Sequence, residues 1–265
     1  MTWCFSILPL RNSYTARYRS PYNDDIGRQP GKVPKSMLSS GNVQRWLGTI
    51  PGVRPVVRTC VLTANTPLAR TRLRRALSRV DRPIWLEIGG HRRRAGWIVT
   101  NVNAVARLYL DATRRWPLDD DAVEYVFSDN VIEHLPLEAA RAMLVEAHRC
   151  LRPGGTIRIV TPDVRAHVEM YLSGAGAMRN GASSHYRDLG LDVEHPIDLV
   201  RIPIAAFGHH AGYVYDFDTL AAELERAGFS NPTRFECGSS DKAALNGLDI
   251  RSAEGGAQLA VQATA

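Results

Sequence analysis

The pattern of hydrophobic and polar positions predicts a strand-helix-strand unit over residues 122–163. Residues 122–127 are a short apolar run rich in Val, Tyr and Phe, which is typical of a strand covered on both faces. Apolar residues at helical spacing follow Pro136, so a helix is expected there. A Gly-Gly pair at 154–155 predicts the end of this helix, and residues 156–161 are the next predicted strand.

Similar patterns predict further strands on both sides of this unit. Residues 84–88 are a predicted strand that ends in Gly89 and Gly90, whose missing side chains allow a ligand to approach the backbone. The segment between Gly90 and Trp97 is short for a crossover with a full helix, so a loop is expected there. The other predicted strands cover residues 56–63, 97–102, 107–110, 233–237 and 258–262.

Beyond the central unit, residues 164–172 are a predicted helix. Residues 173–190 are rich in Gly, Ser and Ala and are expected to pass over the site. An aspartate, either Asp216 or Asp218, can cap a further helix that Gly228 ends.

Basic residues gather in the first 80 residues of this 265-residue chain. Residues 1–80 hold 14 basic residues (Lys and Arg) and two acidic ones, a net charge of +12. Residues 81–265 hold 19 basic and 25 acidic residues, a net charge of −6. Residues 11–41 show no period and are interpreted as loop or disorder. Thr-Pro at 66–67 predicts the start of a basic amphipathic helix over residues 66–80. Such a helix either covers the sheet with its arginines in water or contacts anionic membrane or phosphate groups.

These totals favour a cytoplasmic protein with a basic extension (1–80) and one larger domain (81–265). No uninterrupted apolar run approaches the roughly 20 residues that a membrane span needs, and residues 3–10 lack the features of a signal peptide. The four cysteines are scattered without paired spacing, so reduced thiols are expected and a Cys-based metal site is not.

Four segments, in this order, resemble the class I S-adenosylmethionine-dependent methyltransferases. They are LEIGG (86–90), LYLDATRRWPL (108–118), VEYVFSDNVIEHL (123–135) and LRPGGTIRIVTPD (151–163). The likeness is greatest to a bacterial group of predicted methyltransferases that are often found with glycan-assembly genes. It implies an α/β, Rossmann-like fold with a mostly parallel seven-stranded sheet and an antiparallel C-terminal strand.

The resemblance also implies S-adenosylmethionine as the cofactor. Glu87 would meet its ammonium group. Asn101 stands where the family usually has an acid for the ribose hydroxyls, and Asp111 stands where the family contacts the adenine amino group. The expected cofactor contacts are Glu87, Gly89, Gly90, Asn101, Asp111, Ala112 and Asn130.

Methyl transfer is a direct displacement, so the protein must align the acceptor and, for a hydroxyl, remove its proton. His134 is the first candidate for the base, because imidazole titrates near neutrality, and Glu133 is the second. Both are equally compatible with a structural role at the start of a helix. His209 and His210 lie in a stretch that the family places near the acceptor, although surface or packing roles are the simpler interpretation. The spacing of these histidines does not indicate a metal site.

The leading hypothesis is therefore O-methylation of a small molecule, a sugar or a cell-envelope precursor. One alternative is a binding or scaffold protein with a degenerate methyltransferase fold, indicated by His91 and Asn101 at altered cofactor positions. Another is nucleic-acid methylation or binding through the basic extension, although no aromatic-rich basic recognition motif is present. A dinucleotide oxidoreductase is disfavoured, because GGHRRRAG lacks the G-x-G-x-x-G spacing.

Overall fold

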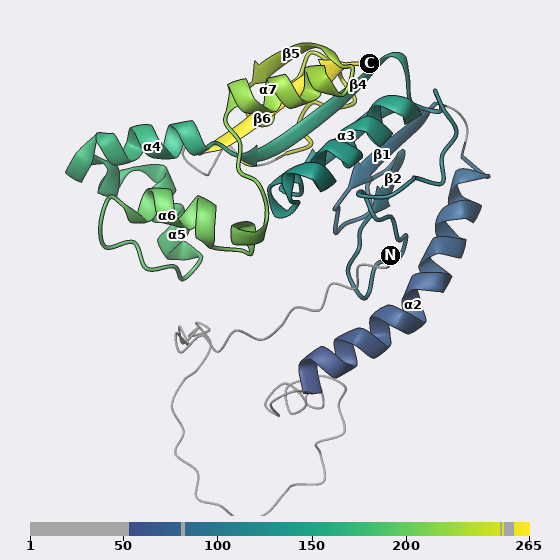
Figure 1. Ribbon diagram of the computed structural model, residues 1–265, viewed down its shortest axis with the longest axis horizontal. Coiled ribbons are helices and arrows are strands. Elements are labelled where there is room, and N and C mark those ends of the chain that lie inside the picture. Colours follow the sequence, from purple (N-terminus) through teal and green to yellow (C-terminus); the bar gives the residue numbers. More distant parts are fainter. Residues whose placement is uncertain (1–52, 81–82, 250, 252–256) are drawn as a thin grey trace, which may run out of the picture. The chain divides into compact units, whose positions relative to one another are not determined.

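The chain folds around one mixed sheet of six strands (Figure 1). In sheet order they are β2 (Trp97–Thr100), β1 (Ile84–Ile88), β3 (Val123–Asp129), β4 (Leu151–Pro162), β6 (Gln258–Thr264) and β5 (Ser230–Phe235). The first four of these run parallel, and β6 is antiparallel to both of its neighbours. This arrangement confirms the predicted Rossmann-like α/β class and its antiparallel C-terminal strand.

The computed structural model describes residues 53–80, 83–249, 251 and 257–265. The loop or disorder predicted for residues 11–41 lies outside them. Within the described ranges no helix combines the length and the apolar character needed to cross a membrane. Among the described residues, Cys60 and Cys150 form no disulfide.

The seventh strand, predicted at residues 107–110, does not form. A single parallel bridge joins Asn101 to Tyr109, and the backbone N–H of Leu110 donates to Asn101 O at 3.4 Å. Parallel strands usually need a crossover of about a dozen residues, whereas the chain here turns back within a few. The described part of the sheet therefore has six strands instead of seven.

Helices cover one face of the sheet and pack their apolar sides on its central strands. They are α2 (Val53–Leu77), α3 (Leu137–Cys150) and α7 (Phe217–Arg226). Pro136 stands directly before α3. The buried side of α3 contains the predicted stripe of Ala140, Met143, Leu144 and Ala147. The side chain of Asp216 caps α7 by accepting a hydrogen bond from the backbone N–H of Thr219 at 2.9 Å, which confirms the predicted helix start.

The Gly-Gly pair at 154–155 lies inside β4 and not at the end of α3, which corrects the prediction. β4 begins at Leu151, immediately after the helix. Val123 of β3 pairs with Leu151, but Tyr125 pairs with Thr156, so the register shifts between these two pairs. The glycines therefore fall in a bulge of the ladder, where the backbone departs from regular strand geometry.

The N-terminal part of α2 corrects two predictions. Residues 56–63 are helical and not a strand, and the helix continues through Pro67 instead of beginning at Thr66. The side chain of Asn65 donates hydrogen bonds to Ala104 O and Ala106 O at 3.1 and 2.8 Å. These tertiary contacts and the buried Ala69 fix the middle of the helix, and residues 56–63 are continuous with it despite their β-branched residues. The arginine face of residues 66–80 is exposed, as expected of a helix that covers the sheet.

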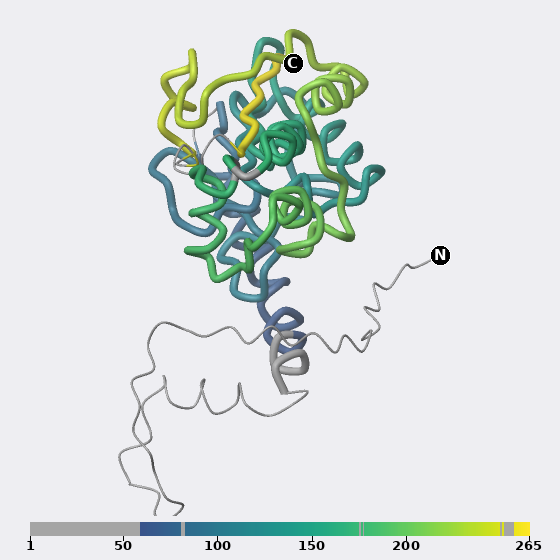
Figure 2. Tube along the Cα trace, turned by 90° about the vertical axis from the view of Figure 1, so that its left-hand side faces the viewer, coloured from purple at the N-terminus to yellow at the C-terminus, as the bar shows by residue number. Residues whose placement is uncertain are grey.

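The connection between β5 and β6 covers the opposite face of the sheet. In Figure 2 this yellow-green segment and the green helix α7 lie to either side of the yellow strand β6. Leu245 of the connection is fully buried against the sheet. Arg158 of β4 is also fully buried, and its Nε and Nη2 atoms donate to Oδ2 of Asp249 at 3.0 and 2.8 Å. A buried ion pair therefore ties the connection to the central strand.

Short helices form a separate layer beyond the carboxyl end of β4 (Figure 1). They are α4 (Val164–Leu172), α5 (Gly181–Asp188) and α6 (Asp198–Ala205). Their own apolar cluster contains Tyr186, Val193, Leu199 and Ile202. The helix predicted at residues 164–172 is confirmed, and much of the predicted excursion after it is helical as well.

A bidentate ion pair joins α3 to α7 and predicts a dependence of stability on pH. Arg141 donates to both carboxylate oxygens of Glu223, at 2.8 and 2.9 Å. These hydrogen bonds lower the pKa of Glu223. The resulting stabilisation is full above the usual pKa of glutamate, about 4.3, and is lost as pH falls through the lower pKa of the folded state.

We expect Glu223→Gln to lower the midpoint of urea denaturation at pH 7, and we expect the difference from wild type to shrink as pH falls through the lowered pKa of Glu223. Glu225→Gln on the exposed side of the same helix is the control and should leave the midpoint unchanged. A difference that persists undiminished in acid would contradict the assignment.

Candidate active site

The turn after β1 lies directly against the turn after β3. Gly89 has a left-handed φ of +79°, and a Cβ atom there would lie 2.2 Å from Cγ2 of Val131. Glu87 is buried, and its Oε2 atom accepts a hydrogen bond from Arg94 Nε at 2.9 Å. Its Oε1 atom would lie 2.5 Å from a Cβ on Gly90. The structure thus brings Glu87 and the two glycines to one corner, where neither glycine has room for a side chain.

Asn101, at the end of β2, holds this corner together. Its Nδ2 atom donates to Gly89 O at 2.8 Å and to Gly90 O at 3.2 Å. Its Oδ1 atom accepts a hydrogen bond from the backbone N–H of Asn103 at 3.0 Å. An aspartate has no N–H to donate to the two glycine carbonyls. Asn101 therefore has a role in this turn that an aspartate could not perform.

Asp111 organises its own turn beside the end of β2. Its Oδ1 atom accepts hydrogen bonds from the backbone N–H and the hydroxyl of Thr113, at 3.1 and 2.7 Å. Its Oδ2 atom lies 3.1 Å from Arg114 Nε. The next residue, Ala112, is buried, and its carbonyl accepts a hydrogen bond from Trp116 Nε1 at 3.1 Å. Because Asp111 stays partly exposed, a ligand has access to its carboxylate.

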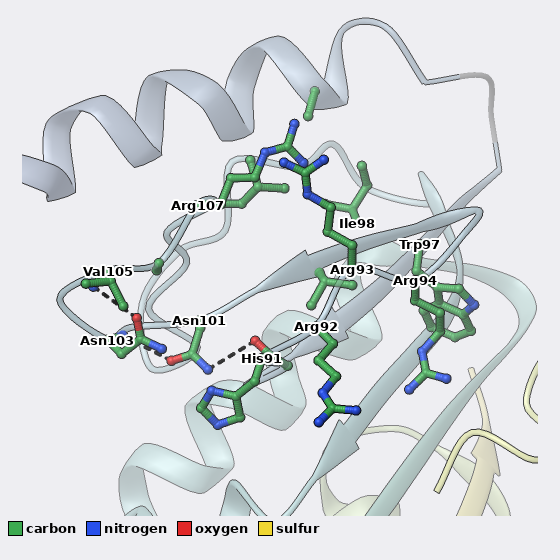
Figure 3. Close-up of a pocket in the computed structure, with 15 residues that line it drawn as sticks. His91, Arg92, Arg93, Arg94, Trp97, Ile98, Asn101, Asn103, Val105 and Arg107 are labelled. Carbon is green, nitrogen blue, oxygen red and sulfur yellow. Dashed lines mark hydrogen bonds between the residues drawn. The ribbon is translucent and has the colours of Figure 1, made fainter. Parts of the chain in front are cut away.

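A cavity of about 490 Å³ opens beside this corner (Figure 3). Gly90 and Asn101 form part of its wall, and Arg93 and Arg107 point towards helix α2 in the view of Figure 3. Its arginines are Arg92, Arg93, Arg94 and Arg107, and the described lining contains no Asp or Glu. The cavity therefore suits a ligand that carries a carboxylate or a phosphate group.

Glu133 is a fully buried carboxylate in η1 (Ile132–His134), the single turn that follows β3. Its Oε2 atom accepts a hydrogen bond from Thr161 Oγ1 at 3.2 Å. Its Oε1 atom has no hydrogen-bond partner among the residues that the structure describes. Burial raises the pKa of Glu133 to about 8. The folded chain therefore holds a carboxyl group in an environment that opposes its charge.

Two histidines meet beside this carboxyl. The rings of His134 and His209, from η1 and from η3 (His209–Ala211), have centroids 4.6 Å apart at an angle of 69°. Nε2 of His209 lies 3.9 Å from Oε1 of Glu133. Desolvation lowers the pKa of both histidines, so the neutral form of each ring predominates at neutral pH. His210, by contrast, is exposed and lies outside this group.

A second cavity, of about 220 Å³, adjoins the two histidines. Asn130 faces it with a left-handed φ of 49° and with a buried Oδ1 atom that lacks a partner in the described part of the chain. Tyr186 of α5 forms another part of its wall. The segment expected to pass over the site, residues 173–190, therefore contributes α5 to the wall of this cavity.

Three contributors to this region were missed by sequence reasoning. Gly212 allows η3 to approach η1 closely, because a Cβ there would lie 1.9 Å from Glu133 O. In the sequence, the local sign of this close approach was the glycine that follows His-His-Ala. Thr161 holds Glu133. Arg251 lines the second cavity and pairs with Asp129 at 3.0 Å, across 122 positions of sequence that no local pattern connects.

A family comparison supports the class of protein that this fold and site define. Residues 95–159 match a family model described as a methyltransferase domain. The match runs from β2 through β3 and α3 into β4 and covers less than half of the chain. It supports a methyltransferase of the S-adenosylmethionine-dependent class, with S-adenosylmethionine as the cofactor. No curated protein matches the chain at a significant level.

Solved structures of methyltransferases are similar at low identity. A methyltransferase from Archaeoglobus fulgidus has 15% identity and a TM-score of 0.40, over 75% of this chain and 94% of the other. A possible histamine N-methyltransferase from Thermotoga maritima has 14% identity and a TM-score of 0.37, over 74% and 91%. The CurJ carbon methyltransferase has 12% identity and a TM-score of 0.39, and 75% of this chain spans only 53% of its length. Similarities at this level assign no acceptor to this chain.

Proposed function

We propose that this chain transfers a methyl group from S-adenosylmethionine to a hydroxyl group of a small molecule, a sugar or a cell-envelope precursor. One observation carries the proposal. The turns after β1 and β3 meet at the carboxyl ends of these two neighbouring strands, where Gly89 lies against Val131. Asn130 at this edge and His134 both line the 220 Å³ cavity. Cofactor and acceptor positions would then adjoin, as a direct displacement requires.

The cofactor, when bound, supplies a methyl group already activated by a sulfonium. We expect it to contact Glu87, Gly89, Gly90, Asn101, Asp111, Ala112 and Asn130. The Oε1 atom of Glu87, which lies beside Gly90, suits its ammonium group, and the partly exposed Asp111 suits a hydrogen-bond donor of adenine. In this proposal Asn101 acts mainly by holding the carbonyls of the glycine turn.

The acceptor is proposed to lie in the 220 Å³ cavity, where its hydroxyl must lose a proton. The group formed by Glu133, His134 and His209 is the proposed place for that proton. His134 is the exposed member, and its lowered pKa keeps a nitrogen lone pair available at neutral pH. We further propose a cytoplasmic reaction in glycan assembly, with residues 66–80 in contact with anionic membrane or phosphate groups.

Calorimetric titration with S-adenosylmethionine tests this proposal. Wild type should bind it, and Asp111→Ala should weaken binding by about 10- to 100-fold, the range for one hydrogen bond to a charged group. Glu225→Ala removes an exposed carboxylate on α7 and should bind as wild type does. Wild type that releases no heat at millimolar ligand would rule out the enzyme.

A binding or scaffold protein is the second candidate, and one observation favours it. Both amide hydrogens and the oxygen of Asn101 are occupied within the chain, so this residue has little left to offer a ribose. The same titration separates the enzyme from the scaffold protein. A scaffold protein, in which Asn101 is fully engaged by the glycine turn after β1, would not bind S-adenosylmethionine.

A further inference from the structure

We propose that Glu133, His134 and His209 form a binding site for one divalent transition-metal ion, with zinc as the reference ion. One carboxylate oxygen and one nitrogen from each imidazole lie within 4.8 Å of one another. The three side chains come from η1 and η3, two turns that are far apart in the sequence. The proposal rests on these side chains and does not depend on methyl transfer.

The ligand set is one that zinc uses. Imidazole nitrogen and carboxylate oxygen bind zinc at about 2.0–2.2 Å, and two histidines with one glutamate are a known catalytic set that leaves a position open. Nε2 of His209 and Oε1 of Glu133 are 3.9 Å apart, so an ion between them would be close to bonding distance of both. His134 is exposed, and one of its ring nitrogens lies within 4.8 Å of the other two ligand atoms.

The surrounding contacts orient two of the three ligands. Nδ1 of His209 lies 2.8 Å from Pro203 O, and it must carry the hydrogen in that contact because a carbonyl only accepts. The lone pair of His209 is therefore on Nε2, which faces Glu133. The hydroxyl of Thr161 holds the other carboxylate oxygen at 3.2 Å. Metal-binding histidines commonly donate their second N–H to a carbonyl in this way.

An independent observation points to a ligand at this position. Oε1 of Glu133 is buried and has no hydrogen-bond partner within the described residues. Such atoms are uncommon, because burial without a partner costs free energy. It lies 3.9 Å from Nε2 of His209, which is too far for a hydrogen bond between them. A cation between the two would satisfy both.

The charges around the group permit a cation. Arg251 is a basic side chain on the adjoining cavity, and it is paired with Asp129 at 3.0 Å, so its charge is offset. His134 and His209 both line the 220 Å³ cavity, so a ligand in this cavity would have access to the open positions of a bound ion. If the proposed methyl transfer also holds, an acceptor hydroxyl bound there would lose its proton to solvent water more readily, and His134 would then be a ligand of the ion in place of the base.

Zinc binding to the full chain tests the site directly. The protein is stripped with a chelator and titrated with Zn²⁺ in competition with a chromophoric chelator. We expect one tightly bound zinc per chain. His134→Ala and Glu133→Gln should each weaken it by at least about 100-fold, since loss of an outer partner alone costs about 10- to 100-fold. His210→Ala, which removes the exposed neighbouring histidine, should bind as wild type does.

Wild-type affinity in both His134→Ala and Glu133→Gln would overturn the proposal, as would an equal loss in His210→Ala. Because His134 is exposed, His134→Ala should fold even if Glu133→Gln does not, and circular dichroism checks this. Magnesium prefers oxygen ligands and should not displace zinc; displacement at equal concentration would also contradict the site. Failure of cofactor binding leaves the zinc result unaffected, so the two proposals fail separately.

Discussion

Asp249→Ala is expected to destabilise the protein by about 3–5 kcal/mol, the usual cost of removing one partner of a buried ion pair. Asp249 and Arg158 both have fully buried side chains. Without the carboxylate, the guanidinium would keep, among the described residues, its hydrogen bonds to Gln262 Oε1 and Glu236 O, at 3.2 and 3.4 Å. Denaturation in guanidinium chloride, followed by circular dichroism, measures the free energy of unfolding.

Two further variants give this prediction its controls. Lys242→Ala in the same connection removes an exposed ion pair with Asp241 and should change the free energy of unfolding by less than about 0.5 kcal/mol. Replacing both Arg158 and Asp249 by apolar residues of similar volume should recover much of the lost stability, because no charge is then left unpaired. A loss below about 1 kcal/mol in Asp249→Ala would show that the pair does not hold the connection.

Gly212→Ala is expected to separate η3 from η1. The new Cβ would lie 1.9 Å from Glu133 O and 2.7 Å from its carbonyl carbon, and these backbone atoms cannot rotate away as a side chain can. Overpacking of this kind costs about 1–3 kcal/mol. The displacement would also move His209 away from Glu133, so zinc affinity should fall together with the unfolding midpoint. Chelator competition and thermal denaturation measure the two effects.

Gly176→Ala is the matched control for this substitution. No atom of the described residues lies within 4 Å of a Cβ at Gly176, and neither glycine has a left-handed φ. The two variants therefore differ in the available space and not in backbone preference. If Gly212→Ala has the same stability and the same zinc affinity as Gly176→Ala, then η3 can shift away from η1 without disturbing the site, and the prediction is wrong.

Local pattern was sufficient for most of the sheet and its helices. β1, β3, α3 and α7 lie where apolar periodicity and caps predict them, because these signals report which side of a short segment is buried. The errors have non-local causes. Asn65 bonds to Ala104 and Ala106 and so helps to make a helix of a segment with strand propensity. The bulge at 154–155 depends on how β4 pairs with β3.

The sequence by itself determined the α/β fold class, the glycine turn after β1 and the polar turn that contains Glu133 and His134. Each of these features depends on the types and spacing of residues that are close together in the sequence. Only the tertiary structure decided that His209 joins them and that Asn101 is engaged by the glycine carbonyls. The path of the chain through α4, α5 and α6 sets where His209 arrives. No short-range pattern encodes that path, since it depends on which distant surfaces pack together.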